Sequence, residues 1–203
     1  RYTAFAQRAR QLRAKGGLGA ISHVTLRMIR PGWARYPAWD SAWLLDPEFA
    51  GGGSLRNLGP HLFDLFHFIT GEEAEVSAAQ MSARAGGERI EDYAQITLRS
   101  SGDISATIEV GNTLPAEPQG IEGTWVVSGR DAYLEQHRSE MRLITAAGHQ
   151  SLSAESDRPI YRDFIRATLD CWQRGDPPPA SAQDCLRAAK LIDQAYDCAT
   201  QLV

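Results

Sequence analysis

The sequence has little cysteine and no excess of positive charge. Its 203 residues include 3 cysteines, and no two of them form a CxxC pair or lie near clustered histidines. This spacing excludes zinc-ribbon and thioredoxin-like sites and argues against a disulfide framework, so we predict no metal site. A formal net charge of -4 at pH 7 argues against nucleic-acid or anionic-membrane binding, which requires a basic surface.

Long apolar runs and nucleotide fingerprints are also missing. The apolar stretch at residues 62–69 is among the longest, and Asp64 and His67 interrupt it, so no segment is suited to span a bilayer. No signal-peptide pattern opens the chain, and we expect a cytoplasmic location. Neither GxGxxG nor GxxxxGKS/T occurs, so the chain has no standard device for cradling a nucleotide.

The first part of the chain mixes helical and extended patterns. Residues 1–15 are apolar at helical spacing, and glycines follow, which predicts an amphipathic helix. Alternation over 20–29 predicts a half-buried strand. Residues 30–53 form a connection of the length that is usually functional or disordered, and its tryptophans argue against disorder. Residues 54–70 return to helical spacing, and Gly71 closes that helix.

The chain is β-rich from there to about residue 147. Turn residues separate the candidate strands 76–83, 93–99, 104–110, 124–128, 133–137 and 141–146. Residues 100–103 have the composition of a hairpin turn. Clean alternation in the two strands that flank this turn is typical of an antiparallel sheet with one face on a core.

Two helices are expected at the end of the chain. Asp157 and Pro159 begin the first, which ends at Gly175, and Ser181 is the predicted N-cap of the second, with Asp184 three residues on. We interpret the helix faces that carry the cysteines as core. The whole pattern predicts one α+β domain over residues 1–203, with an open, mainly antiparallel sheet and helices packed on one face.

Asn57, His61 and Asp64 form the constellation most suggestive of chemistry. Their spacing places them on one face of a continuous helix, where a carboxylate and a carboxamide could fix the tautomer of a proton-transferring histidine. Pro60 predicts that the helix kinks there or begins at Leu58 or Gly59. The alternative interpretation is a hydrogen-bonded core histidine beside a capping or surface aspartate.

The stretch Gly51-Gly52-Gly53-x-Leu55-x-Asn57-x-Gly59-x-His61-x-x-Asp64 resembles a family signature, GGGxLxDxGxHxxD. This signature is characteristic of the glucose-fructose oxidoreductase and inositol dehydrogenase (Gfo/Idh/MocA) family. It lies in the C-terminal, dihydrodipicolinate-reductase-like domain, which follows the nucleotide-binding domain. Weaker similarities at residues 12–21, 43–48 and 175–195 extend the resemblance over nearly the whole chain.

The resemblance implies an NAD(P)-dependent oxidoreductase acting on a sugar, a polyol or a related small hydroxy or keto metabolite. His61 matches the family's proton-transferring histidine. Asn57 matches a position that is usually Asp, so we expect it to position substrate rather than to accept a proton. The family's catalytic lysine, in an EKP motif, has no counterpart here.

Further residues are assigned on the same grounds. Arg35, Tyr36 and Trp39 are expected to bind substrate from the long connection; the alternative is a loop that packs on itself or contacts another subunit. Asp64 is a supporting residue, expected to orient the helix or to hydrogen-bond backbone. The supporting glycines are Gly52 and Gly53.

The resemblance also implies what the chain lacks. NAD or NADP would bind a separate N-terminal domain that residues 1–16 would abut, and this chain alone would bind neither. The start at Arg1 favours a fragment of a longer enzyme. The free sheet face would form a homodimer or homotetramer. The alternative is a free-standing, non-catalytic module for oligomerisation or ligand binding on the same scaffold.

Overall fold

The structure, a computed structural model, describes residues 1–115, 121–154 and 159–200. Its sheet has eight strands in the order β2-β3-β4-β1-β5-β6-β7-β8. Neighbouring strands are antiparallel except β1 and β4, which are parallel. The strands are β1 (Ile21–Pro31), β2 (Ala74–Ser82), β3 (Tyr93–Ser100), β4 (Ser105–Leu114), β5 (Glu122–Gly129), β6 (Ala132–His137), β7 (Glu140–Thr145) and β8 (Gly148–Ser153).

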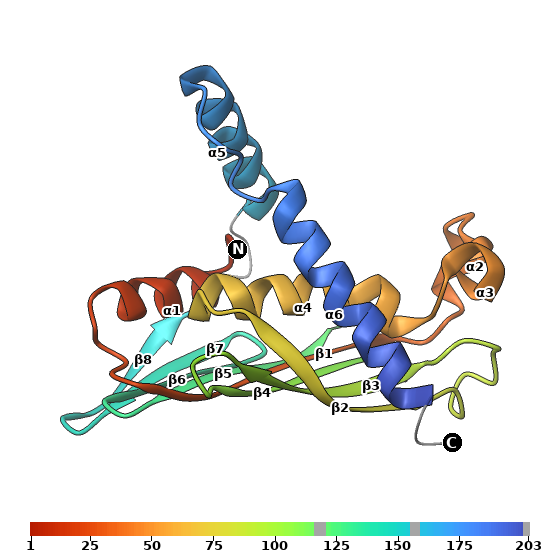
Figure 1. The fold of residues 1–203 in the computed structure, drawn as a ribbon, viewed down its shortest axis with the longest axis horizontal. Helices are drawn as coiled ribbons and strands as arrows, with labels where there is room; N and C mark the ends of the chain where they lie inside the picture. The colour runs from red at the N-terminus through yellow and green to blue at the C-terminus, as the bar shows by residue number, and fades with distance from the viewer. Residues whose placement is uncertain (116–120, 155–158, 201–203) are drawn as a thin grey trace.

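The long helices lie on one side of this sheet, as Figure 1 shows. They are α1 (Ala4–Ala14), α4 (Ser54–Thr70) and α6 (Ala182–Thr200), while α5 (Ile160–Arg174) projects away from the sheet. The connection after β1 contains three short helical segments, α2 (Arg35–Ala38), η1 (Ala42–Leu45) and α3 (Pro47–Ala50). The predicted fold class, an open, mainly antiparallel α+β domain with helices on one face, is confirmed.

The core lies between the sheet and the long helices. One stripe of α4 buries Leu55, Leu62 and Ile69, and alternate residues of β3 and β4 meet it from the sheet. Burying a leucine side chain stabilises the fold by about 1.5–3 kcal/mol. Because α4 is anchored at several such points, its direction relative to the sheet is fixed.

The helix α4 does not begin at Leu58 or Gly59, which is one of the two effects predicted for Pro60. The helix runs without interruption from Ser54 to Thr70 with Pro60 inside it. A proline in a helix costs about 3 kcal/mol, chiefly through one lost hydrogen bond and a steric clash. Burial of Leu58 and Leu62, on either side of Pro60, offsets that cost. Asn57, His61 and Asp64 therefore do share one continuous helix.

The interpretation of the cysteine-bearing helix faces as core is wrong for α5 and holds for most of α6, where Ile192 is buried and Cys198 packs against the core. α5 buries no residue, and Cys185 at the start of α6 is exposed. Tyr161 and Trp172 of α5 are 84% and 79% exposed. The apolar stripe of α5 is real, but no described element of this chain covers it, although Tyr2 makes an edge contact with Phe164.

The remaining sequence predictions differ mainly at their boundaries. β8 was not predicted, because its residues are mostly polar and exposed. Ser181 does precede α6, and its hydroxyl and backbone exchange hydrogen bonds with Asp184, as expected for a capping box. The predicted start of α5 at Asp157 lies outside the described residues. None of the helices in the described part of the chain is sufficiently long and apolar to cross a membrane.

Candidate functional site

A cleft of about 900 Å³ lies between α4, α6, the end of β1 and the connection that follows β1. This volume is within the range of small-molecule sites. Every side chain predicted to act on the substrate lines this cleft, namely His61, Asn57, Arg35, Tyr36 and Trp39, and so does Asp64. The two segments that carry them, α2 and α4, are separated by η1 and α3.

The beginning of α4 is held by Glu91, which sequence reasoning missed. The Glu91 carboxylate accepts hydrogen bonds from the backbone N–H groups of Gly53 and Leu55, at 2.8 and 2.9 Å, and from the Tyr196 hydroxyl at 2.8 Å. It takes the place of an N-cap side chain, because the N-cap residue itself is Gly53. Glu91 lies 36 and 38 positions from Leu55 and Gly53, and sequence periodicity cannot pair residues that far apart.

This contact explains the supporting glycines. A Cβ atom on Gly53 would lie 2.0 Å from the Glu91 carbonyl oxygen, and one on Gly52 would lie 2.0 Å from the Tyr196 hydroxyl. Gly52 also has φ of +148°, which side chains rarely tolerate. Both glycines therefore support the site by letting the chain pass close to Glu91 and Tyr196. Burial raises the pKa of the Tyr196 hydroxyl, and the Glu91 carboxylate raises it further.

A chain of hydrogen bonds joins the connection to α4. Arg35 donates to the Tyr36 hydroxyl at 3.1 Å, and Asn57 donates to the same hydroxyl at 2.7 Å. Arg35 also donates to Asn112, so both ends of the chain are fixed. Arg35 and Tyr36 are buried, at 4% and 2% exposure, whereas Asn57 is exposed in the cleft. The connection after β1 therefore packs on itself through Arg35 and Tyr36, and the same two residues line the cleft.

His61 is exposed on the cleft wall and makes no hydrogen bond to any described residue. The predicted relay is not formed, because Asn57 bonds Tyr36 and Asp64 bonds Arg1. Desolvation lowers the pKa of His61 from its ordinary 6.5, and the Asp64 charge opposes this. The imidazole is therefore neutral at pH 7 and available to a ligand.

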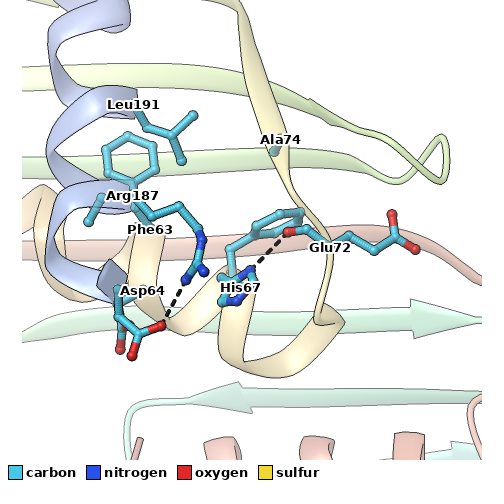
Figure 2. A pocket seen from close by; sticks show the side chains of 10 residues that line it. Phe63, Asp64, His67, Glu72, Ala74, Arg187 and Leu191 are labelled. Atoms are coloured by element: carbon cyan, nitrogen blue, oxygen red, sulfur yellow. Dashed lines mark hydrogen bonds and ion pairs between the residues drawn. The ribbon is translucent and has the colours of Figure 1, made fainter. Parts of the chain in front are cut away.

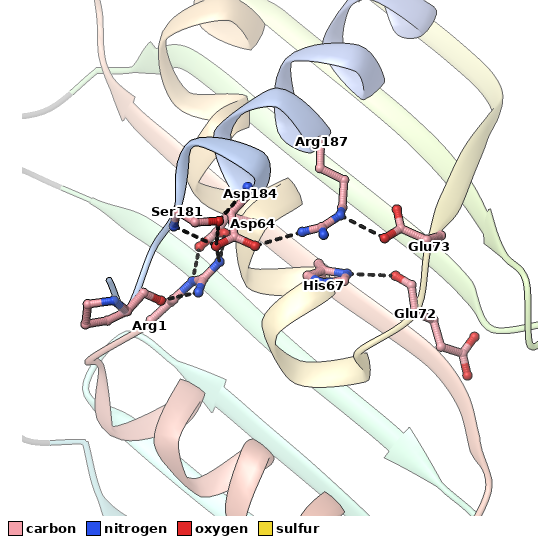
Figure 3. Close-up of polar contacts among 9 residues, drawn as sticks. Arg1, Asp64, His67, Glu72, Glu73, Ser181, Asp184 and Arg187 are labelled. Carbon is pink, nitrogen blue, oxygen red and sulfur yellow. Dashed lines mark hydrogen bonds and ion pairs between the residues drawn. The ribbon is translucent and has the colours of Figure 1, made fainter. Parts of the chain in front are cut away.

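Asp64 belongs to a network of ion pairs, drawn in Figure 3. The Arg1 guanidinium contacts both oxygens of Asp64 and also pairs with Asp184 at 3.1 Å. Arg187 continues the network from Asp184 to Glu73, at 2.8 Å each. Of the two roles expected for Asp64, these ion pairs are of the kind that orients the helix: the carboxylate joins α4 to the chain before α1 and, through Arg1 and Asp184, to α6.

A much smaller hollow lies on the other side of Asp64, between α4, α6 and β2 (Figure 2). Its volume is about 10 Å³, room for about one water molecule. His67 lines it, and its Nδ1 lies 3.1 Å from the Glu72 carbonyl oxygen. His67 therefore has a structural role, and the hollow is too small for a substrate. Within the described ranges, no group of three potential ligands could hold a metal ion.

The open sheet, its single layer of helices and the cleft on the helix side together define an α+β domain with a site of small-molecule size, in which polar side chains stand among apolar ones. The model of the GFO/IDH/MocA C-terminal domain family matches residues 6–135. The chain therefore belongs to this family, and the resemblance seen in the glycine-histidine motif is confirmed. A search of the curated proteins finds no match to the sequence.

Solved structures share this fold at low sequence identity. An aldose-aldose oxidoreductase from Caulobacter crescentus, complexed with glycerol, has a TM-score of 0.82 and 20% identity. An oxidoreductase from Agrobacterium radiobacter, in complex with NAD+, L-tartaric acid and magnesium, has a TM-score of 0.83 and 18% identity. Each match covers 100% of this chain, which spans 60% and 61% of those chains. Levoglucosan dehydrogenase, in complex with NADH and levoglucosan, covers 98% of this chain at a TM-score of 0.79 and 16% identity; the match covers 63% of the dehydrogenase.

Proposed function

We propose that this chain is the substrate domain of an NAD(P)-dependent oxidoreductase whose substrate is a sugar, a polyol or a related hydroxy or keto metabolite. The observation that carries the proposal is that His61 is exposed and unbonded among the described residues in a cleft of about 900 Å³ that Asn57 also lines. Family membership supports the reaction class. The named ligands of the neighbours, which include NAD+, NADH, levoglucosan and L-tartaric acid, support the cofactor and the substrate class.

His61 is the proton-transfer residue in this proposal. In the oxidative direction its neutral imidazole accepts the proton of the substrate hydroxyl, while a hydride leaves the carbinol carbon and a carbonyl forms. The nicotinamide, bound by a part of the parent outside this chain, supplies the hydride acceptor. In the reverse direction the imidazolium returns the proton to the carbonyl oxygen as the hydride arrives.

Asn57 and Tyr36 hold the substrate in this scheme. Asn57 uses its Nδ2 to bond the Tyr36 hydroxyl, which leaves its Oδ1 for a substrate hydroxyl. The amide cannot take a proton, so it leaves proton transfer to His61. The exposed ring of Trp39 lines the same cleft, where it provides an apolar surface for the carbon face of a sugar.

The exposed face of α5 is assigned to the nucleotide-binding part of the parent. Tyr161, Ile165, Leu169 and Trp172 are each between 48% and 84% exposed on this helix. Patches of this kind mark contact surfaces rather than ordinary surface. Tyr161 also lines the cleft, so a domain docked on α5 would bring its nicotinamide near the substrate. That residues 1–16 abut the same domain stays a prediction, as do the choice between NAD and NADP and the cytoplasmic location.

The helix-free face of the sheet is assigned to self-association into a dimer or tetramer. On that face Thr97, Thr107, Thr25 and Val126 lie opposite one another across β3, β4, β1 and β5. Such a row of small β-branched side chains makes a flat surface that a second copy can cover. Sedimentation of Thr107→Arg should show a smaller species than wild type, with Gln150→Arg on β8 as the control.

Kinetics of the complete protein test the enzymatic proposal. His61→Ala should lower kcat by about 10²–10⁴-fold on a panel of sugars and polyols, the usual contribution of one proton-transfer group. His149→Ala, which removes an exposed histidine on β8, should leave turnover unchanged. Equal turnover of wild type and His61→Ala would contradict the assigned role. NAD(P)-independent ligand binding without any turnover would favour the non-catalytic module.

A further inference from the structure

Arginine is the main source of charge in the cleft. Arg1, Arg30, Arg35 and Arg56 line it, with Asp64 and Asp184 as the acidic residues. Arg1 is neutralised by both aspartates, and Arg56 pairs with Asp193 at 2.9 Å. The other two arginines differ from these, because no carboxylate of the described residues pairs with either of them.

Arg35 is a buried guanidinium with neutral partners. It donates to the Gly32 carbonyl at 3.2 Å, to the Tyr36 hydroxyl and to the side-chain oxygen of Asn112. The Tyr36 and Trp39 rings lie 4.6 and 5.9 Å from its central carbon. These contacts satisfy hydrogen bonds and give some cation–π stabilisation, but they leave the positive charge without a counter-ion.

Arg30 brings a second positive charge to the same place. It stands near the end of β1, and its side chain makes no hydrogen bond or ion pair with any residue that the structure describes. Both arginine side chains line the same cleft, so their positive charges face one cavity. Burial lowers the pKa of Arg35, and the Arg30 charge adds to this effect while Tyr36 opposes it. Two like charges with no acid between them are destabilising unless an anion binds them.

We propose that Arg30 and Arg35 bind an anionic group of the substrate, a carboxylate or a phosphate, and thereby select a sugar acid or sugar phosphate over a neutral sugar. This inference rests on the proposed function for the reaction itself. The anionic group lies at the β1 end of the cleft, and the reacting hydroxyl lies at His61 on α4. The positive cleft is not a consequence of overall composition, since the chain has a formal net charge of -4.

Calorimetric titration of the complete protein, without cofactor, tests the binding. Gluconate, glucose 6-phosphate and the neutral glucitol are the probes. We expect at least one anion to bind about tenfold or more tightly than glucitol, as charge-assisted hydrogen bonds to arginine would give. Arg30→Gln should abolish this preference, and Arg30→Lys should keep part of it. Whether the carboxylate or the phosphate binds more tightly identifies the group.

A matched control lies on the same strand. Arg27 faces the opposite side of the sheet and pairs with Glu109 at 3.1 Å, so Arg27→Gln should leave the preference for the anion intact. Equal binding of all three probes, or a preference that survives Arg30→Gln, would overturn the inference. The circular dichroism spectrum of Arg30→Gln should match that of the wild type, which verifies that the variant is folded.

Steady-state kinetics separate this inference from the proposed function. Arg30→Gln should lower kcat/KM for the preferred acid or phosphate by about tenfold and leave the KM for NAD+ unchanged. A raised KM for NAD+ alone would show that the two arginines bind the cofactor's phosphates, and would overturn the inference. If anion binding depends on Arg30 but no substrate is turned over, the anion site stands and the proposed reaction fails. If neutral and anionic substrates are turned over equally, the reaction stands and the anion site fails.

Discussion

Asn57 on α4 donates a hydrogen bond of 2.7 Å to the hydroxyl of Tyr36 on α2, 21 residues earlier in the chain. The Tyr36 hydroxyl also accepts from Arg35, so one oxygen joins the connection to the helix that carries His61. Its position links the two segments predicted from sequence to bind substrate. The stability of the site therefore depends on a side chain that is 2% exposed.

Tyr36→Phe should destabilise the domain by about 1–3 kcal/mol, the cost of leaving the buried Arg35 donor without this acceptor. Arg35 and Asn57 would both lose their shared partner. Urea unfolding followed by circular dichroism measures the change. Tyr161→Phe is the matched control, because Tyr161 is 84% exposed and its change should stay within about 0.5 kcal/mol. Equal losses in the two variants would contradict the assigned hydrogen bonds.

Gly53→Ala should destabilise the domain by about 1–3 kcal/mol, because the added Cβ atom would overlap the Glu91 carbonyl oxygen at 2.0 Å. The displacement would also weaken the two hydrogen bonds by which Glu91 caps α4. Gly17→Ala provides the control, since its Cβ atom would meet Leu12 at an ordinary 3.4 Å. Thermal unfolding of both variants decides the matter, and an unchanged midpoint for Gly53→Ala would refute the close approach.

Asp184→Asn should remove part of the pH dependence of stability. Partial burial opposes ionisation, but hydrogen bonds from Ser181 and Arg187 and the Arg1 charge prevail and lower the pKa of Asp184 below its ordinary 3.8. A lowered folded pKa gives stability that is present above 3.8 and is lost as the pH falls through the folded value.

The free energy of unfolding of wild type and Asp184→Asn should therefore differ most above pH 3.8 and converge below it. Urea titrations over a series of acidic pH values measure this. Asp103→Asn is the control, because Asp103 is 76% exposed in its side chain and pairs with Arg99, which is also exposed, so solvent screens the pair. A constant difference between wild type and Asp184→Asn at every pH would exclude the assigned ion pairs.

The pH profile of the complete enzyme should report His61. Because burial disfavours the imidazolium, the acidic limb of kcat/KM for oxidation should have its midpoint below pH 6.5. Asp64→Asn should move that midpoint to still lower pH, since the Asp64 charge raises the pKa of His61. A midpoint that stays in place, or moves upward, would show that another group controls the limb.

Local patterns in the sequence were sufficient to predict most elements. Helical spacing gave α1 and α4, and alternation gave β3 nearly to the residue and β4 up to Val110, four residues before its end. Both patterns show which side of an element is buried, and each can be recognised within a short stretch of sequence, because the helical period is 3.6 residues and the strand period is 2. The same locality explains the failures. β8 has no buried alternation, and the effect of Pro60 depended on how firmly Leu58 and Leu62 are packed by distant strands.

The sequence by itself determined the fold class, because helical spacing and alternation act within single segments. It also carried the motif whose resemblance indicated the family and predicted His61, Asn57, Arg35, Tyr36 and Trp39 as site residues. Only the tertiary structure decided their partners. Glu91 meets Gly53 across 38 positions and Arg1 meets Asp64 across 63, and no periodicity encodes such pairs. The order of the strands also matters. β1 lies between β4 and β5, and its end brings Arg30 to the cleft that Arg35 lines. The charge of the site is therefore a property of the folded chain.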